Sequence, residues 1–249
     1  MDIVLILVFL LLFIKIRLKT ESEDYLDKKQ TASINGFFII LVFICHFSSY
    51  VELNNQYDKL FLLFYEKICQ LVVTTFLFYS GYGVMKSIQN KGESYIRSMP
   101  KNRILKTFIT FGIAIMLYVL IDLVIGEKLK LSQVLLAFIG WTSIGNSNWY
   151  IFAILIMYIL TWLSFRIKIN KSHFWSIFLN SVLVCAYVIV IMNYKESRFY
   201  NTVLCYVLGM WFAFFKPWID RFLKKNWVYG SVIGVTLLIF VYTYINKDA

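Results

Sequence analysis

The side chain best suited to chemistry is His46, which lies near the end of a long apolar run at residues 31–50. Asn35 precedes it by eleven residues, which on a helix brings both side chains within roughly 20° of one face. Ser49 and Tyr50 continue that face. An ionisable residue inside a membrane span predicts a functional site, and a neutral imidazole suits general-base catalysis. A structural histidine bonded to a neighbouring helix is the competing interpretation.

A second group of chemistry-bearing residues lies in the basic segment 86–106, which holds Lys101, Arg103 and Lys106 and contains Pro100. Guanidinium and ammonium groups suit phosphates, so these three predict a site for a polyanion. Basic residues beside membrane spans also set topology and contact anionic lipid heads, which explains most of them without any ligand. We expect this segment to be a loop with a short interfacial helix.

Polar and aromatic side chains at the ends of other apolar runs are candidates for holding a second substrate. Glu66 lies one turn into the run at 60–85, where it either snorkels outward or orients His46. Trp149 and Tyr150 start another run. Stacking on a sugar and membership of the interfacial aromatic belt both explain them.

Small residues mark the tract FYSGYG at 78–83. Glycine and serine within an apolar run are typical of close helix packing, and they also admit a ligand next to the backbone. Packing is the favoured interpretation of this tract.

The elements that must position these residues are membrane helices. A chain with 60% hydrophobic and 16% charged residues is not an ordinary soluble domain. Runs long enough to cross a bilayer recur along it. We predict an all-α, polytopic transmembrane helical bundle of about eight spans. The predicted spans are 3–18, 34–51, 60–85, 107–125, 149–165, 173–193, 199–215 and 228–245.

The topology depends on the segment 131–148, which is apolar but short and is interrupted by Gly140 and Gly145. If this segment does not cross, 18 of the 25 Lys and Arg residues lie on one side, as the positive-inside rule requires. We therefore predict a re-entrant or interfacial segment whose broken backbone is covered by protein or a water-filled cavity. The protein is then expected to be a multi-pass protein of the cell (plasma) membrane, with both termini extracytoplasmic.

The charge and the cysteines exclude several other classes. The net charge of +11 lies in the loops, which indicates membrane topology and not nucleic-acid binding, so the expected surroundings are the lipid bilayer. The sequence contains no Walker loop, dinucleotide fingerprint, HExxH or CxxC pair, so we expect neither an ATP-driven pump nor a metal site. The four cysteines lie in apolar runs and are interpreted as small buried hydrophobes, not as a disulfide framework.

Four patterns, taken in order, resemble acyltransferase family 3. They are SINGFFIILVFICHF (33–47), FYSGYG (78–83), YIRSMPKNRILK (95–106) and GNSNWYIFAILIMY (145–158). The likeness covers roughly residues 28–215. It is greatest to bacterial members that O-acetylate cell-surface polysaccharides.

The resemblance implies transfer of an acyl group, acetyl being the expected one, from cytoplasmic acetyl-CoA to a hydroxyl of a cell-envelope polysaccharide or glycan precursor. His46 matches the essential histidine of the family and is the expected catalytic base. Asn35 departs from the family pattern, because it stands where the family has Arg or Lys. The expected acyl-CoA contacts are Asn35, Lys101, Arg103 and Lys106. The expected contacts to the glycan acceptor are Tyr50, Glu66, Trp149 and Tyr150.

The domain organisation follows from the same resemblance. Residues 1–27 are predicted to be an additional N-terminal membrane anchor and charged linker, and residues 28–249 an acyltransferase-like transmembrane domain. This domain is about two spans shorter than the ten typical of the family, which indicates a shortened or incomplete member.

Two rival functions stay open. One is a transporter or flippase of glycan or lipid precursors in which His46 relays protons, although the sequence offers no clear inverted repeat. The other is a catalytically degenerate family member acting as an assembly partner, which Asn35 favours. The sequence leaves the oligomeric state open, a homo-oligomer included.

Overall fold

The structure is a computed structural model that describes residues 1–15, 24–167 and 172–245. Within these residues the chain is helical and contains no strand. The long helices are α1 (Asp2–Lys15), α2 (Lys28–Phe47), α3 (Lys59–Lys91), α5 (Lys106–Ile125), α7 (Trp149–Arg166), α8 (His173–Ile191), α9 (Leu204–Leu223) and α10 (Asn226–Ile245). The shorter elements are α4 (Glu93–Met99), α6 (Leu131–Phe138), the π-helix η3 (Pro100–Leu105), and the 3-10 turns η1 (Ser48–Tyr50), η2 (Gln56–Asp58) and η4 (Ser197–Phe199).

The prediction of an all-helical multi-pass membrane protein is confirmed. In the described part of the chain, seven helices are long and apolar enough to cross a bilayer, and α1 adds a shorter apolar helix at Asp2–Leu11. As predicted, the segment 131–148 is not among these candidate spans of the described residues. Its helix α6 has eight residues, so it is about 12 Å long against a hydrocarbon core of about 30 Å.

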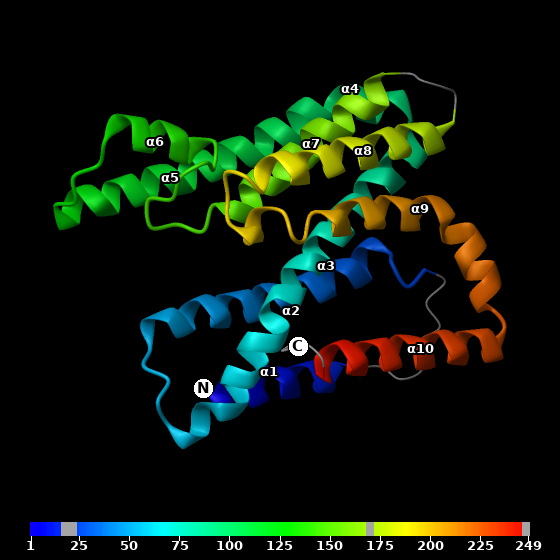
Figure 1. Cartoon of the computed structure of the whole chain (residues 1–249), viewed down its shortest axis with the longest axis horizontal. Coiled ribbons are helices and arrows are strands. Elements are labelled where there is room, and N and C mark those ends of the chain that lie inside the picture. Colours follow the sequence, from blue (N-terminus) through cyan, green and yellow to red (C-terminus); the bar gives the residue numbers. More distant parts are fainter. Residues whose placement is uncertain (16–23, 168–171, 246–249) are drawn as a thin grey trace.

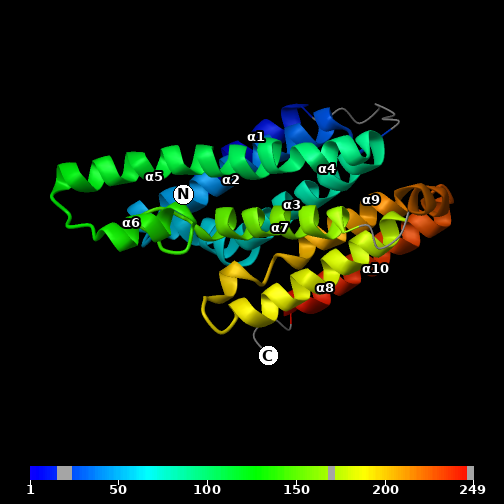
Figure 2. The ribbon, with the colours of Figure 1, turned by 90° about the horizontal axis from the view of Figure 1, so that it is seen from above.

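Successive helices connect at alternating ends of the bundle (Figure 1). The α2–α3, α5–α6 and α8–α9 connections lie towards the left of Figure 1, and the α3–α4 and α9–α10 turns towards the right. Turned by 90°, α4 and α5 lie on one side, α8 and α10 on the other, and α3 and α7 between them (Figure 2). The left end in Figure 1 is called the pocket end below.

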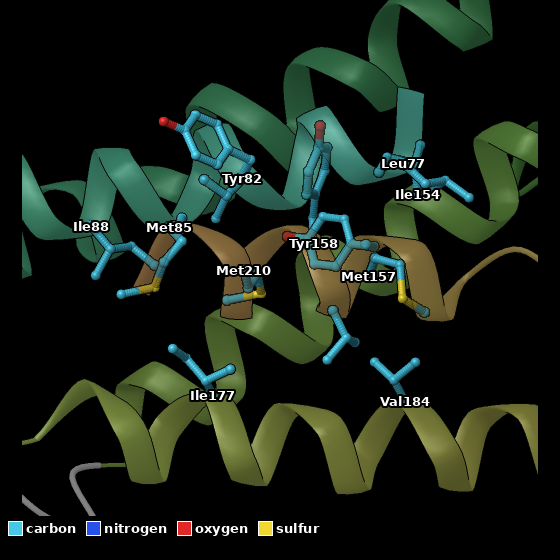
Figure 3. Close-up of a cluster of buried hydrophobic side chains, with 14 of the residues drawn as sticks. Leu77, Tyr82, Met85, Ile88, Ile154, Met157, Tyr158, Ile177, Val184 and Met210 are labelled. Atoms are coloured by element: carbon cyan, nitrogen blue, oxygen red, sulfur yellow. The ribbon is translucent and has the colours of Figure 1, made fainter. Parts of the chain in front are cut away.

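The main core lies between α3, α7, α8 and α9. Figure 3 shows Met85 of α3 and Met210 of α9 in one cluster, with Ile177 and Val184 reaching up towards it from α8. All four side chains are fully buried. Because lipid tails are as apolar as these side chains, dense packing and not removal from water holds such helices together.

The closest helix contact joins α3 to α9 at two glycines. A Cβ atom on Gly81 would lie 1.9 Å from the carbonyl oxygen of Tyr206, and one on Gly209 would lie 2.1 Å from that of Phe78. The favoured interpretation of the tract at 78–83 therefore holds for Gly81, whose missing side chain lets two backbones touch. Gly83 has open space where a Cβ would be.

The segment 86–106 corrects a prediction, because most of it is helix and not loop. Helix α3 continues to Lys91, and the chain reverses at Gly92 with φ of 57°. Helix then runs from Glu93 through Pro100 into α5. Proline removes one backbone donor, and the chain accommodates the loss by widening into the π-helix η3. The break expected at Pro100 is therefore only a local change of helical pitch.

Helix α2, which carries His46, packs on the first half of α3 and on α1. Leu41 and Ile44 of α2 are buried with Leu5 of α1 and Phe61 of α3. The Asp2 carboxylate accepts a 2.8 Å hydrogen bond from the backbone N–H of Phe61, which fixes the start of α1. Cys45 is disulfide-bonded, so interpreting every cysteine as a simple buried hydrophobe was wrong.

The outer helices present apolar side chains to their surroundings. Leu120, Ile121 and Val124 of α5 and Leu237 and Leu238 of α10 are more than half exposed. In water such a surface would be an interaction site, whereas in hydrocarbon it is the expected lipid-facing wall.

Candidate functional site

A pocket of about 630 Å³ opens at the pocket end, where the α6–α7 loop, the α8–α9 loop and the last turn of α2 meet. The α6–α7 loop contributes most of residues 141–149, the α8–α9 loop residues 194–199 without Ser197, and α2 contributes His46. Small-ligand pockets occupy roughly 300–1,000 Å³. The pocket is therefore large enough for a sugar residue or a short oligosaccharide.

The α6–α7 loop holds its shape through its glycines and asparagines. Gly140 and Gly145 adopt φ of 74° and 93°, values that a residue with a Cβ atom rarely adopts. Asn148 is buried and donates from Nδ2 to the carbonyl of Gly140 at 2.7 Å. The Asn146 Oδ1 accepts from the backbone N–H of Ile144 at 3.1 Å. These hydrogen bonds pair backbone groups of the loop that have no partner in a helix. The loop is therefore held in one conformation and forms a wall of the pocket.

Lys195 joins the two loops. Its Nζ donates to the backbone carbonyl of Trp141 at 2.5 Å. The same atom lies 4.0 Å from the centroid of the Trp141 ring and 5.3 Å from that of Phe199, in cation–π contact. Burial lowers the pKa of Lys195, and neighbouring Glu196 opposes this shift. Glu196 is itself ion-paired with Arg198.

The predicted base and acceptor contacts are placed as follows. His46 is exposed and lines the pocket, and Trp149 lines it too. Tyr150 is turned away from the pocket and packs edge-on against Phe76 at 6.4 Å between ring centroids. Tyr50 is 84% exposed and, like Glu66, lies outside the pocket lining. The assignment of Tyr50, Glu66 and Tyr150 to the acceptor stays a prediction.

Among the predicted acyl-CoA contacts, Arg103 is turned into the bundle. Its Nε donates to the Tyr95 hydroxyl at 3.1 Å, and its guanidinium carbon lies 5.9 Å from the centroid of the Tyr158 ring. The Tyr158 hydroxyl in turn lies 2.8 Å from Ser80 Oγ. A line of polar groups therefore runs from η3 through α7 to α3. It includes Ser80 of the tract at 78–83.

The other predicted acyl-CoA contacts differ in exposure. Lys101 and Lys106 flank Arg103 but are exposed. Asn35 is half-buried on α2, and its Oδ1 is buried without a hydrogen-bond partner among the described residues. A buried amide oxygen left unpaired costs about 1–3 kcal/mol. It is therefore an acceptor available to a ligand.

A charged cluster at the opposite end ties the segment before α2 to α9. Lys216 is only 6% exposed, and its Nζ lies 2.6 Å from an Asp220 oxygen and 3.3 Å from an Asp24 oxygen. Its Nζ also lies 4.4 Å from the centroid of the Tyr25 ring, and Tyr25 donates to Asp220 at 2.8 Å. Burial, followed by the hydrogen bond to Asp220, raises the pKa of Tyr25. The cluster thus anchors the start of the helix that carries His46.

Pro217 lies inside α9 beside this cluster. Having no N–H, it leaves the carbonyl of Ala213 without its helical donor. Gln89 of α3 supplies a donor instead, with Nε2 3.4 Å from that oxygen. The bend of α9 is visible at the right of Figure 1. It is attributed to this proline.

Sequence reasoning missed most of the pocket. Trp141, Asn146, Asn148 and Lys195 were not among the predicted site residues, although they line the pocket with His46. A usable signal was present, because an apolar segment broken by glycines and rich in asparagine needs a cavity to cover it. The residues that the α8–α9 loop adds to the pocket have no comparable pattern in the sequence.

Together these observations define a multi-pass helical membrane protein with a polar, aromatic-walled pocket at one end and an inward-facing arginine in its interior. The acyltransferase domain family matches residues 32–247, and the chain belongs to this family, acyltransferase family 3. It is a membrane acyltransferase. No curated protein and no solved structure gives a significant match.

Proposed function

We propose that this acyltransferase moves an acyl group, acetyl being the expected one, from acyl-CoA on the cytoplasmic side to a hydroxyl of a cell-envelope polysaccharide or glycan precursor on the other side, with His46 as the general base. The observation that carries the proposal is the position of His46. It ends its helix at the wall of a pocket large enough for a sugar and lined by aromatic and amide side chains.

The acyl transfer requires a general base and correct placement of the two substrates. An imidazole nitrogen of His46 accepts the proton of the glycan hydroxyl as its oxygen attacks the thioester carbonyl. The tetrahedral intermediate collapses, the carbon–sulfur bond breaks, and the imidazolium returns its proton to the departing CoA thiolate. The products are the O-acylated glycan and free CoA, so protons and electrons balance without a metal or a redox partner.

The donor is proposed to enter from the end opposite the pocket. Under the positive-inside topology, the turn at Gly92 faces the cytoplasm, and exposed Lys101 and Lys106 offer point charges to the phosphates of CoA. Arg103 is the inward-facing cation of the group. The pantetheine arm carries amide N–H groups, and Asn35 Oδ1, which has no hydrogen-bond partner in the part of the chain that the structure describes, is a matching acceptor. Asn35 lies about 16 Å before His46 along α2 at 1.5 Å per residue.

The proposal is tested with the purified full-length protein in lipid nanodiscs, using radiolabelled acetyl-CoA and a panel of polysaccharide acceptors. His46→Ala is expected to lower kcat by about 10²–10⁴-fold, the usual contribution of a general base. Because His46 is exposed, the melting temperature of the His46→Ala protein should equal that of wild type. Tyr57→Phe is the matched control, because Tyr57 of η2 is also exposed and lies outside the pocket.

Retention of transfer within threefold of wild type by His46→Ala would remove His46 from the chemistry. If wild-type protein transfers acetyl to no acceptor yet moves an intact glycan precursor across proteoliposomes, the rival transporter function replaces this proposal.

A further inference from the structure

The pocket carries an unbalanced positive charge. Its charged side chains are Lys195, Glu196 and Arg198. Glu196 accepts from Arg198 Nε at 2.7 Å, so these two neutralise one another. In the part of the chain that the structure describes, no carboxylate lies within ion-pair distance of Lys195. The ammonium group of Lys195 therefore remains as the net charge of the pocket.

The ammonium group of Lys195 is held in place by the protein but has N–H donors that remain unused. An ammonium group has three N–H donors, and the Trp141 carbonyl accepts one of them at 2.5 Å. The ring faces of Trp141 and Phe199 fix its direction. These partners are neutral, so they orient the ammonium group without cancelling its charge. A ligand that reaches Lys195 can accept its other two N–H groups.

Asn146 adds an unused donor to the same wall. Its Oδ1 is committed to the Ile144 backbone N–H at 3.1 Å, which fixes the orientation of the amide. Its Nδ2 is buried and has no acceptor among the described residues. Leaving a buried donor unpaired costs about 1–3 kcal/mol. Asn146 Nδ2 has no acceptor among the described residues, and Lys195 has N–H groups left over, so a ligand with acceptor atoms could bind both.

We propose that the acceptor glycan carries an anionic group, and that its oxygens bind Lys195 and Asn146 while a hydroxyl of the same glycan reaches His46. The required chemistry is an oxyanion with two acceptor oxygens. The carboxylate of an acidic sugar and the phosphodiester of a sugar-phosphate polymer both supply it. Trp149 offers an aromatic face on which a sugar ring stacks. This inference rests on the proposed function for the identity of the ligand as an acceptor.

The test compares three acceptors with the full-length protein in nanodiscs: oligogalacturonate, the neutral galactose oligomer of equal length, and a glycerol phosphate oligomer. For wild type, the KM of at least one anionic acceptor is expected to be about tenfold or more below that of the neutral one. Lys195→Met should raise the anionic KM by about 10–100-fold, the range for a hydrogen bond to a charged group. The neutral KM should stay within threefold.

Two variants separate this role from a structural one. Lys195→Arg keeps the charge and should restore most of the anionic preference. Lys130→Met removes an exposed lysine from the α5–α6 connection at the same end and should have no effect. The melting temperature of each variant shows whether it is folded.

Binding of the three oligomers is also measured directly by titration calorimetry without acetyl-CoA. Lys195-dependent binding of an anionic oligomer without any transfer would support the anion site and overturn the proposed acetyltransferase function. Transfer to all three acceptors with equal KM, unchanged in Lys195→Met, would overturn the anion site and leave the function standing. The carboxylate and phosphodiester arms identify which anion the pocket takes.

Discussion

Gly81 on α3 lies directly against the backbone of Tyr206 on α9, where a Cβ atom would be 1.9 Å from the Tyr206 carbonyl oxygen. Helices α3 and α9 therefore meet backbone to backbone at the centre of the core. Tyr206 is fully buried there, with its hydroxyl 3.0 Å from Thr161 Oγ1 of α7. The contact fixes three of the four core helices, on which both the pocket end and the Arg103 region are built.

Gly81→Ala should destabilise the protein strongly, because the new methyl group can be accommodated only by separating two backbones. Overpacking costs about 1–3 kcal/mol and occasionally more, so a melting temperature several degrees lower, or loss of folded protein, is expected. Gly83→Ala is the matched control, because a Cβ there meets no atom within 4 Å. It should be neutral or stabilise by up to about 1 kcal/mol through helix propensity. Equal melting temperatures for the two variants would contradict the close contact.

Arg103→Lys should raise the KM for acetyl-CoA by about tenfold, with little change in melting temperature. A lysine keeps the charge but loses the planar donor group that bonds Tyr95 and lies against Tyr158. Lys101→Gln and Lys106→Gln remove exposed charges of the same segment and should each change KM less than threefold. Steady-state kinetics on the protein in nanodiscs gives the KM for acetyl-CoA of each variant. A larger effect at Lys101 or Lys106 would argue against an inward-facing donor site.

Lys216→Met should lower the free energy of unfolding by about 1–2 kcal/mol, because Asp24 and Asp220 would lose the cation that they share. Adding Asp220→Asn should recover part of this loss, since one uncompensated carboxylate is then neutral. The exposed neighbour Arg221 provides the control variant Arg221→Met. Thermal unfolding of the detergent-solubilised variants gives the comparison. If the loss of unfolding free energy in the double variant equals the sum of the losses in Lys216→Met and Asp220→Asn, Lys216 and Asp220 are not energetically coupled.

The anionic preference should weaken at alkaline pH. Burial lowers the pKa of Lys195 from its ordinary value of 10.5, so the ammonium group deprotonates at a lower pH than a free lysine. Binding of an anion needs the protonated form, so the KM of the anionic acceptor should rise as the pH passes upward through that lowered pKa. The KM of the neutral acceptor is the internal reference.

Lys195→Arg is the control for this pH profile, because arginine stays charged. His46, Tyr194, Glu196 and Arg198 also line the pocket, and they are the same in both proteins. The difference between the two profiles therefore isolates Lys195. Identical profiles would assign the alkaline loss to another group.

Individual elements show how far the sequence alone could lead. The segment 131–148 was placed correctly outside the set of spans, because its length, its glycines and the charge of its neighbours are local properties. The segment 86–106 was misplaced as a loop, because polarity and Pro100 suggested a break, whereas the chain absorbs the proline in a π-helix. Polarity shows where a helix leaves the apolar layer, but not where it ends.

The sequence by itself determined the membrane class, the order of the helices and the presence of His46 near one end of its helix. Hydrophobic runs and charge bias act over a single helix length, so they can be read along the chain. Only the tertiary structure decided that Lys195 contacts Trp141, that Arg103 and not its basic neighbours turns inward, and that Lys216 holds Asp24. Each of these contacts joins separate elements. Inside a bilayer, helices select their partners by packing geometry and by pairing polar groups, and neither can be read from the sequence of one helix.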